Sequence, residues 1–109
     1  MTIDEVAATA APLTIERKAR LLGRLSFELT IAGRDTYVAG SEDVAAPAQL
    51  RAFNEIQHRV AGCLQELMSG RSTDIWIWPA ISEFASRAGC EGQLIQACRK
   101  ALDSLPEIN

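Results

Sequence analysis

Aromatic residues are scarce in this chain, and their scarcity argues against a β-sheet. They make up 6% of the 109 residues, whereas hydrophobic residues as a whole reach 48%. Alanine and leucine dominate the hydrophobic content, and both favour helices, while sheets select β-branched and ring side chains. The composition therefore predicts an all-α protein.

Paired cysteines are also missing. Cys63, Cys90 and Cys98 are an odd number and contain no C-x-x-C pair. This pattern excludes a disulfide framework and gives no set of ligands for a structural zinc ion. We expect free, mostly buried thiols in a reducing compartment.

Long apolar runs and a basic leader are absent as well. Asp4 and Glu5 stand where a signal peptide carries positive charge, and no apolar stretch is long enough for export or for a membrane span. We therefore expect a cytoplasmic protein that makes no contact with membranes. The net charge of −3 means that the molecule as a whole does not attract nucleic-acid phosphates.

Helical periodicity appears after the first dozen residues. We interpret residues 1–12 as a flexible N-terminal leader and residues 13–109 as a single helical-bundle domain. Apolar residues at three- and four-residue spacing predict two long helices, over about 14–39 and 47–69. Because the loop between them is short, we expect the two helices to pack as an antiparallel hairpin.

Two shorter helices follow. Pro79 fits the first turn of a helix over about 79–88, preceded by an irregular segment at 75–78. A last helix is expected over about 91–105, after Gly89. The short helices would close over the open side of the hairpin and complete a bundle.

Two stretches carry a resemblance. L-S-F-E-L-T-I-A-G-R-D-T-Y at 25–37 and R-A-F-N-E-I-Q-H-R-V at 51–60 resemble a group of small uncharacterised bacterial helical proteins. The resemblance covers most of residues 18–105 and implies the same pair of long helices with a short helical tail. The group has no assigned activity, so the resemblance implies no catalytic residue.

A non-enzymatic protein interaction is the function that we favour, with a homodimer or another protein as the partner. On the second long helix, polar and small residues would let another helix approach closely. Two tryptophans would anchor a partner if they were exposed, or plug the end of the core if they were not. The interface candidates are Asn54, His58, Gly62, Gln65, Trp76 and Trp78.

A nucleic-acid-binding role is the alternative. Residues 79–105 resemble a helix-turn-helix, and the second helix would present Gln93, Gln96, Arg99 and Lys100 to base edges. Charge argues against this role, because residues 72–109 contain three basic and five acidic side chains. An ordinary corner between two helices of a bundle explains the same pattern.

A dimeric metal site is a second alternative. Glu55 and His58 have the E-x-x-H spacing of di-iron bundles, and Glu28 on the neighbouring helix would supply a further carboxylate. Two copies would be needed to complete the ligand count. The simpler interpretation is a solvated polar face, and we expect no cofactor and no metal.

Catalytic patterns are otherwise lacking. Cys90, next to a helix start, is the one thiol whose pKa a helix dipole would lower. No histidine lies near it in the sequence, and phosphate loops and serine elbows are absent. We therefore favour a protein that is not an enzyme.

Overall fold

The computed structural model describes residues 1–39, 46–71 and 73–106, and within them the chain forms five helices and no strand. This confirms the predicted all-α fold. No helix in that part of the chain is long and apolar enough to cross a membrane. The helices are α1 (Ile3–Ala10), α2 (Ile15–Ala39), α3 (Ala46–Met68), α4 (Ile77–Ala88) and α5 (Glu91–Asp103).

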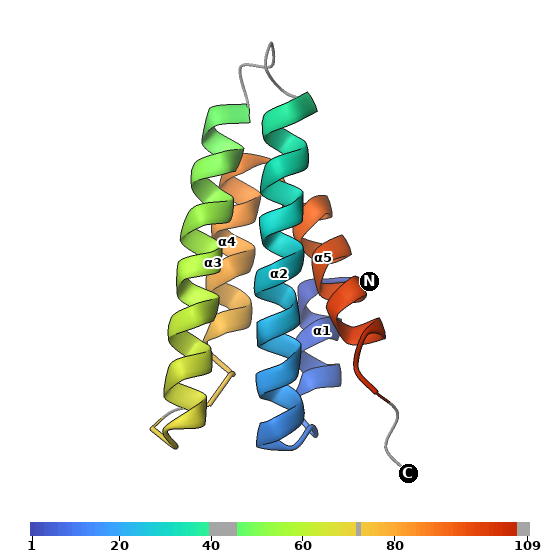
Figure 1. The fold of residues 1–109 in the computed structure, drawn as a ribbon, viewed down its shortest axis with the longest axis vertical. Helices are drawn as coiled ribbons and strands as arrows, with labels where there is room; N and C mark the ends of the chain where they lie inside the picture. Colours follow the sequence, from blue (N-terminus) through green and yellow to red (C-terminus); the bar gives the residue numbers. More distant parts are fainter. Residues whose placement is uncertain (40–45, 72, 107–109) are drawn as a thin grey trace.

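The two long helices, α2 and α3, pack against each other along their length and run in opposite directions (Figure 1). Thr14 begins α2 as its N-cap, because its hydroxyl accepts a hydrogen bond of 3.2 Å from the Arg17 amide. On their inner sides the two helices contribute fully buried apolar residues at helical spacing. These are Leu21, Leu22, Leu25 and Leu29 from α2 and Phe53, Ile56, Val60 and Cys63 from α3.

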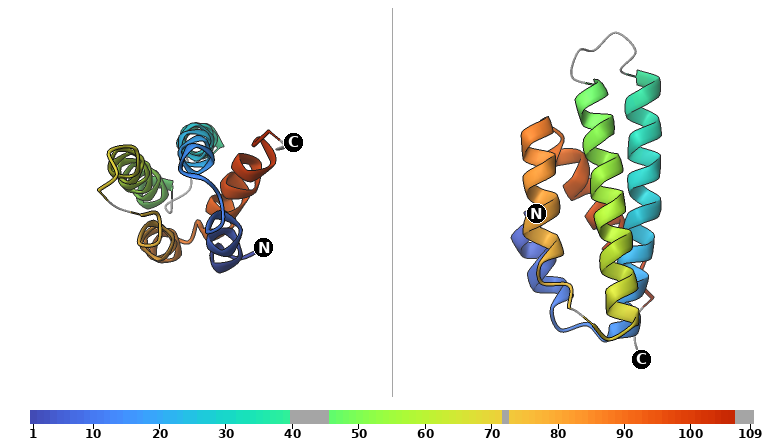
Figure 2. Two further views of the ribbon diagram at one scale, coloured as in Figure 1. Left: turned by 90° about the horizontal axis from the view of Figure 1, so that it is seen from below. Right: turned by 90° about the vertical axis from the view of Figure 1, so that its left-hand side faces the viewer.

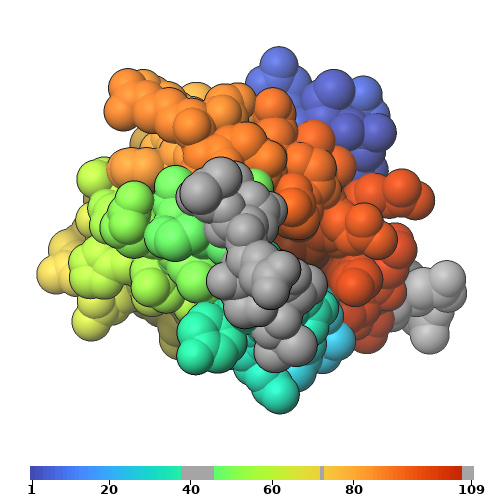
Figure 3. Space-filling view, turned by 90° about the horizontal axis from the view of Figure 1, so that it is seen from above, coloured from blue at the N-terminus to red at the C-terminus, as the bar shows by residue number. Residues whose placement is uncertain are grey.

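The short helices cover only one side of this hairpin. α4 packs on α3, α5 packs on α2, and α4 and α5 also contact each other. Seen end-on, the helices surround a common core, with α1 between α4 and α5 (left panel of Figure 2). Seen from above, the end of α2 and the start of α3 occupy one side of the molecule, opposite α4 (Figure 3). The other side of the hairpin carries no helix from the described residues.

The expected flexible leader is wrong for residues 3–10, which form α1. The Thr2 hydroxyl accepts a 3.2 Å hydrogen bond from the Glu5 amide and so caps the helix. Ile3, Val6 and Ala10 then share one face and are buried against α4 and α5. This short helix is held by packing, since eight residues form too few turns to be stable alone.

The start of α4 also differs from the sequence-based expectation. The helix begins at Ile77 rather than at Pro79, so residues 77 and 78 are helical and not irregular. Pro79 is tolerated as the third helical residue because backbone amides of the first turn have no partner within the helix. At the other end Gly89 adopts a φ of 72°, a left-handed conformation that glycine permits, and α5 begins two residues later.

A buried polar cluster ties α2 to the segment before α4. Lys18 Nζ lies 2.8 Å from Asp74 Oδ1, and the Trp78 indole donates a 3.2 Å hydrogen bond to Asp74 Oδ2. Asp74 is 3% exposed, so its charge is compensated by these two donors rather than by water. The cluster places Trp78 in the core at one end of the bundle.

Candidate interaction surface

The uncovered side of the hairpin, which we call the outer face, is built from two rows of residues. Both rows follow a 4-3-4-3-4 spacing, which places their members on one side of each helix. None of the twelve residues is buried, and none is charged. The rows are Ala19, Gly23, Ser26, Thr30, Gly33 and Tyr37 on α2, and Leu50, Asn54, Gln57, Ala61, Leu64 and Met68 on α3.

Gln57 joins the two rows at their centre. Its side-chain amide donates one hydrogen bond to the Thr30 hydroxyl and another, of 3.1 Å, to the Ser26 carbonyl. The Ser26 carbonyl is part of the backbone of α2, so the Gln57 side chain links α3 directly to that backbone. We call Gln57 the polar clasp between the two helices. These two hydrogen bonds fix the position of α3 along the axis of α2, at a level where the facing side chains are small.

Above this clasp the two rows separate around a hollow of about 380 Å³. Leu29 and Phe53 lie beneath it, and Tyr37 and Leu50 line its upper part. Gly33 also lines the hollow, and a Cβ at this position would lie 4.0 Å from the Phe53 Cβ, an ordinary van der Waals contact. The hollow thus offers ring and aliphatic carbon to a partner.

The residues that border the outer face carry its charge. Each border residue follows a member of a row by one position. Arg24 and Glu55 also follow a row member by one position, but they form salt bridges to Glu28 and Arg59. Six further residues of this register within α2 and α3 are exposed, and they include three arginines but no carboxylate. They are Arg20, Phe27 and Arg34 on α2, and Arg51, His58 and Gln65 on α3. We call these six the flanking positions.

The three flanking arginines have no acidic partner within the described residues. Arg24, one turn from the flanking row, forms a 2.8 Å salt bridge to Glu28 and lies 4.8 Å from the centroid of the Phe27 ring. Two exposed carboxylates of α2 lie near this border, Asp35 next to Arg34 and Glu16 one turn before Arg20, and neither forms a salt bridge within the described residues. The border is therefore basic although the whole chain is acidic.

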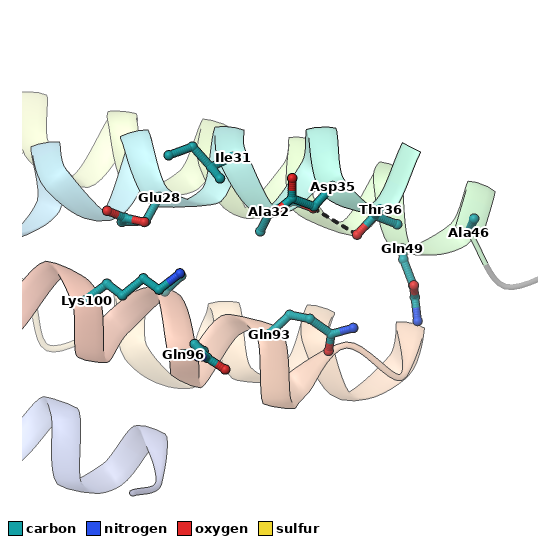
Figure 4. A pocket seen from close by; sticks show the side chains of 11 residues that line it. Glu28, Ile31, Ala32, Asp35, Thr36, Ala46, Gln49, Gln93, Gln96 and Lys100 are labelled. Carbon is teal, nitrogen blue, oxygen red and sulfur yellow. Dashed lines mark hydrogen bonds between the residues drawn. The ribbon is translucent and has the colours of Figure 1, made fainter. Parts of the chain in front are cut away.

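A second hollow, also of about 380 Å³, lies between α2 and α5 (Figure 4). Its walls are polar: Glu28 and Asp35 stand on α2, and Gln93, Gln96 and Lys100 stand on α5. Glu28 is 6% exposed and is held by Arg24 rather than by Lys100. The floor is made of alanine side chains such as Ala32 and Ala97.

The helix-turn-helix candidates all lie on α5, and most of them border this cleft. Gln93, Gln96 and Lys100 line the cleft on the α5 side and remain exposed (Figure 4). Arg99 is exposed and borders a smaller hollow on α5. Gln96 and Lys100 line this smaller hollow as well, whereas Gln93 lines only the cleft.

The predicted interface residues fall into three groups. Asn54 belongs to the outer face, and His58 and Gln65 occupy flanking positions. Gly62 is partly exposed, one position beyond the α3 row. Trp78 is 2% exposed and bonded to Asp74, and Trp76 is partly buried against the core, so the tryptophans help to close the core instead of offering a free anchor.

The predicted metal ligands do not come together in one chain. Glu28 faces the cleft beside α5, while Glu55 lines a depression beside α4 and is bridged to Arg59 at 3.1 Å. His58 is exposed and lines neither of these two hollows. Across residues 1–39, 46–71 and 73–106, no three His, Cys, Asp or Glu side chains form a group able to hold a metal ion.

The thiols are all free and buried. Burial raises the pKa of Cys98 to about 12 and, with help from the nearby Asp74 and Glu66 charges, that of Cys63 to about 11. Burial also raises the pKa of Cys90, so the expectation that the dipole of α5 lowers it was wrong. Desolvation of the thiolate outweighs a helix N-terminus at this position.

The α2 row was missed at the sequence level. Its signal is present in the chain, as uncharged residues at 4-3-4-3-4 spacing from Ala19 to Tyr37. The stronger leucine stripe on the same helix conceals it, because leucine dominates any search for apolar periodicity. Knowing which side of α2 stays uncovered makes the second stripe visible.

Comparison with known proteins adds no relative: no protein-family model, no curated protein and no solved structure matches the chain.

Proposed function

We propose that this chain is a non-enzymatic protein interaction module whose binding surface is the outer face of the α2–α3 hairpin. The observation that carries the proposal is the absence of charge from all twelve residues of that face, in a chain with 25 Asp, Glu, Lys and Arg residues. Depletion of charge at the centre of a partly exposed surface distinguishes interfaces from ordinary solvated helix faces.

The shape of the outer face supports the same role. Small residues such as Gly23, Ser26 and Ala61 allow another helix to come close, and the hollow beside Tyr37 would receive its larger side chains. From Ala19 to Tyr37 the α2 row is about 27 Å long, at about 1.5 Å per residue. A single amphipathic helix of a partner matches this length and groove.

The setting expected from the sequence is part of the proposal. We propose a bacterial, cytoplasmic protein, since three buried free thiols suit a reducing compartment. We assign no reaction to it, because its thiols have raised pKa values and are protonated at neutral pH. The nucleic-acid alternative receives no support from the cleft-facing side chains of α5.

Site-specific photocrosslinking tests the binding surface. Tyr37→benzoylphenylalanine places a reactive ring on the outer face at a position that is 71% exposed, so the fold should tolerate it. Ile75→benzoylphenylalanine is the matched control, because Ile75 is 75% exposed and lies before α4, away from the outer face.

We expect irradiation in the source cells to give a discrete adduct from position 37 and none from position 75. The adduct's second protein would be identified by mass and the complex rebuilt from the two purified proteins. Equal adducts at both positions, or an adduct from position 75 alone, would overturn the proposed surface. Persistent absence of any adduct at position 37, with the variant folded, would do the same.

A further inference from the structure

We infer that the occupant of the outer face is an amphipathic helix with acidic residues on both sides of its apolar stripe, supplied by another protein and not by a second copy of this chain. This inference depends on the proposed function, because it names the partner of the proposed surface. It is carried by the flanking positions and not by the face itself. The uncharged face would accept many apolar helices, whereas the flanks discriminate among them.

The flanking arginines are placed to select charge. Arg20 and Arg34 border the α2 row two helical heptads apart, with Arg34 at the hollow between the rows, and Arg51 borders the α3 row on the side of α4. A helix lying along the outer face would bring its own border residues next to these guanidinium groups. Arginine offers a planar fork of donors that pairs with carboxylates in two hydrogen bonds, so Glu or Asp is the complementary residue.

The three flanking arginines are available to pair with a partner, because they form no salt bridge within the described residues. Four other cations, Lys18, Arg24, Arg59 and Arg87, form salt bridges to carboxylates within the described part of the molecule. Arg20, Arg34 and Arg51 have no such bridge in the same residues. Arg71, Arg99 and Lys100 likewise form no salt bridge in that part of the chain, so the three flanking arginines are distinguished by their place beside an uncharged surface and not by being unpaired.

A second copy is a poor occupant for the same reason. In a symmetric dimer each surface meets its own image, so basic borders would face basic borders. The six flanking positions contain no carboxylate, and Glu55, which stands in the same register on α3, is already bridged to Arg59 at 3.1 Å. Like charges brought together at an interface oppose binding and favour partners of opposite sign.

Two synthetic peptides of about 18 residues, the length that spans the α2 row at about 1.5 Å per residue, test the inference directly. Both carry the same leucine and alanine stripe. One has glutamate at the border positions of its helix and the other has lysine. Binding to the intact protein is followed by backbone amide shifts in NMR spectra, which report both affinity and place.

We expect the glutamate peptide to bind about tenfold more tightly than the lysine peptide, a difference of about 1.4 kcal/mol. Its shifts should fall on residues 19–37 and 50–68, and the preference should fade near 1 M salt, where the screening length is about 3 Å. The double variant Arg34→Glu, Arg51→Glu should lose or reverse the preference. Arg99→Glu is the matched control, an exposed arginine on α5 with no salt bridge among the described residues, and should leave it unchanged.

The outcomes separate this inference from the proposed function. If both peptides bind the outer face equally, or if the lysine peptide binds better, the acidic partner is wrong while the surface stands. If neither peptide shifts residues of the outer face, both proposals fail. The inference also fails if the protein's mass doubles through that face without peptide, or if a single-stranded oligonucleotide shifts the same residues more strongly than the glutamate peptide does.

Discussion

The inner and outer sides of the α2–α3 hairpin are built with the same helical spacing but from opposite kinds of residue. On the inner side Leu22, Leu25 and Leu29 recur along α2 and are fully buried. On the outer side Ser26, Thr30 and Gly33 recur at similar spacing and remain partly or fully exposed. The inner side supplies the free energy of folding, because burial of large apolar side chains is its main source. The outer side contributes little to folding and is free to serve another purpose.

The two sides also differ in how they treat charge. Asp74, a buried carboxylate in the segment before α4, pairs with Lys18 of α2 and with the Trp78 indole. On the outer side the two rows are uncharged, and Arg20, Arg34 and Arg51 at their borders form no salt bridge within the described residues. An unpaired charge is too costly to bury in a core, whereas on a binding surface it stays solvated until a partner of opposite charge binds. Four measurements test this difference between the two sides.

The largest contrast is expected between adjacent residues on α2. Leu25→Ala should lower the free energy of unfolding by about 3 kcal/mol, because it removes a fully buried side chain and leaves a cavity. Ser26→Ala should change it by less than about 0.5 kcal/mol. Urea unfolding of both variants measures the difference. Similar losses from the two substitutions would contradict the division into an inner and an outer side.

The polar tie to α4 comes next. Asp74→Ala should cost about 3 kcal/mol, because it strands the Lys18 ammonium and the Trp78 indole in a poorly solvated place. Glu83→Ala, which removes an exposed pair with Arg87 on α4, is the control and should cost less than about 1 kcal/mol. A small loss for Asp74→Ala in denaturant unfolding would show that water reaches these groups.

The third test uses alkaline pH, at which the buried cysteine thiols of the core lose their protons. Their pKa values are raised from 9.0, to about 11 for Cys63 and about 12 for Cys98, so between these limits the unfolded chain loses protons that the folded chain keeps. Stability is therefore complete below pH 9 and falls as the pH rises, by up to about 1.4 kcal/mol per pH unit for each thiol.

The double variant Cys63→Ala, Cys98→Ala separates this effect from other alkaline titrations. Its free energy of unfolding should fall less steeply above pH 9 than that of the parent chain, although its value at neutral pH is lower. Parallel pH profiles for the two proteins would mean that the thiols are solvated in the folded state.

The smallest expected change is a gain. Gly23→Ala should raise the free energy of unfolding by about 1 kcal/mol, since a Cβ there meets no atom within 4 Å and alanine is the better helix former. On the outer face, however, the added methyl group stands where a partner helix would approach, so peptide binding should weaken. Gly62→Ala is equally unobstructed but lies outside the two rows, and should stabilise α3 without affecting binding. Loss of binding in both variants would enlarge the surface, and loss in neither would remove Gly23 from it.

Much of this architecture could be predicted from the order of residues alone. The leucine stripe of α2, the apolar stripe of α3 and the capping Thr14 define the long helices to within one residue of their observed ends. The last helix was predicted two residues too long at its C-terminus, a usual uncertainty for fraying ends. Local signals sufficed here because helix formation depends on neighbours three and four positions away.

α1 shows where local signals were present but undervalued. Thr2 and Glu5 have the spacing of a capping box, and Ile3, Val6 and Ala10 form a short stripe. Eight residues cannot maintain a helix without tertiary packing, so the expectation of a flexible leader was reasonable for the isolated segment. Only the groove between α4 and α5 makes this helix stable.

The residue types and their periods were determined by the sequence itself: five amphipathic segments, unpaired thiols and two uncharged rows on the long helices. The tertiary structure decided which side of the α2–α3 hairpin would be covered, because α4 and α5 can shield only one side of a two-helix hairpin. The same packing placed Gln93 and Lys100 at the cleft between α2 and α5 and left Arg34 and Arg51 outside it. Exposure results from contacts between segments distant along the chain, and no local pattern encodes it.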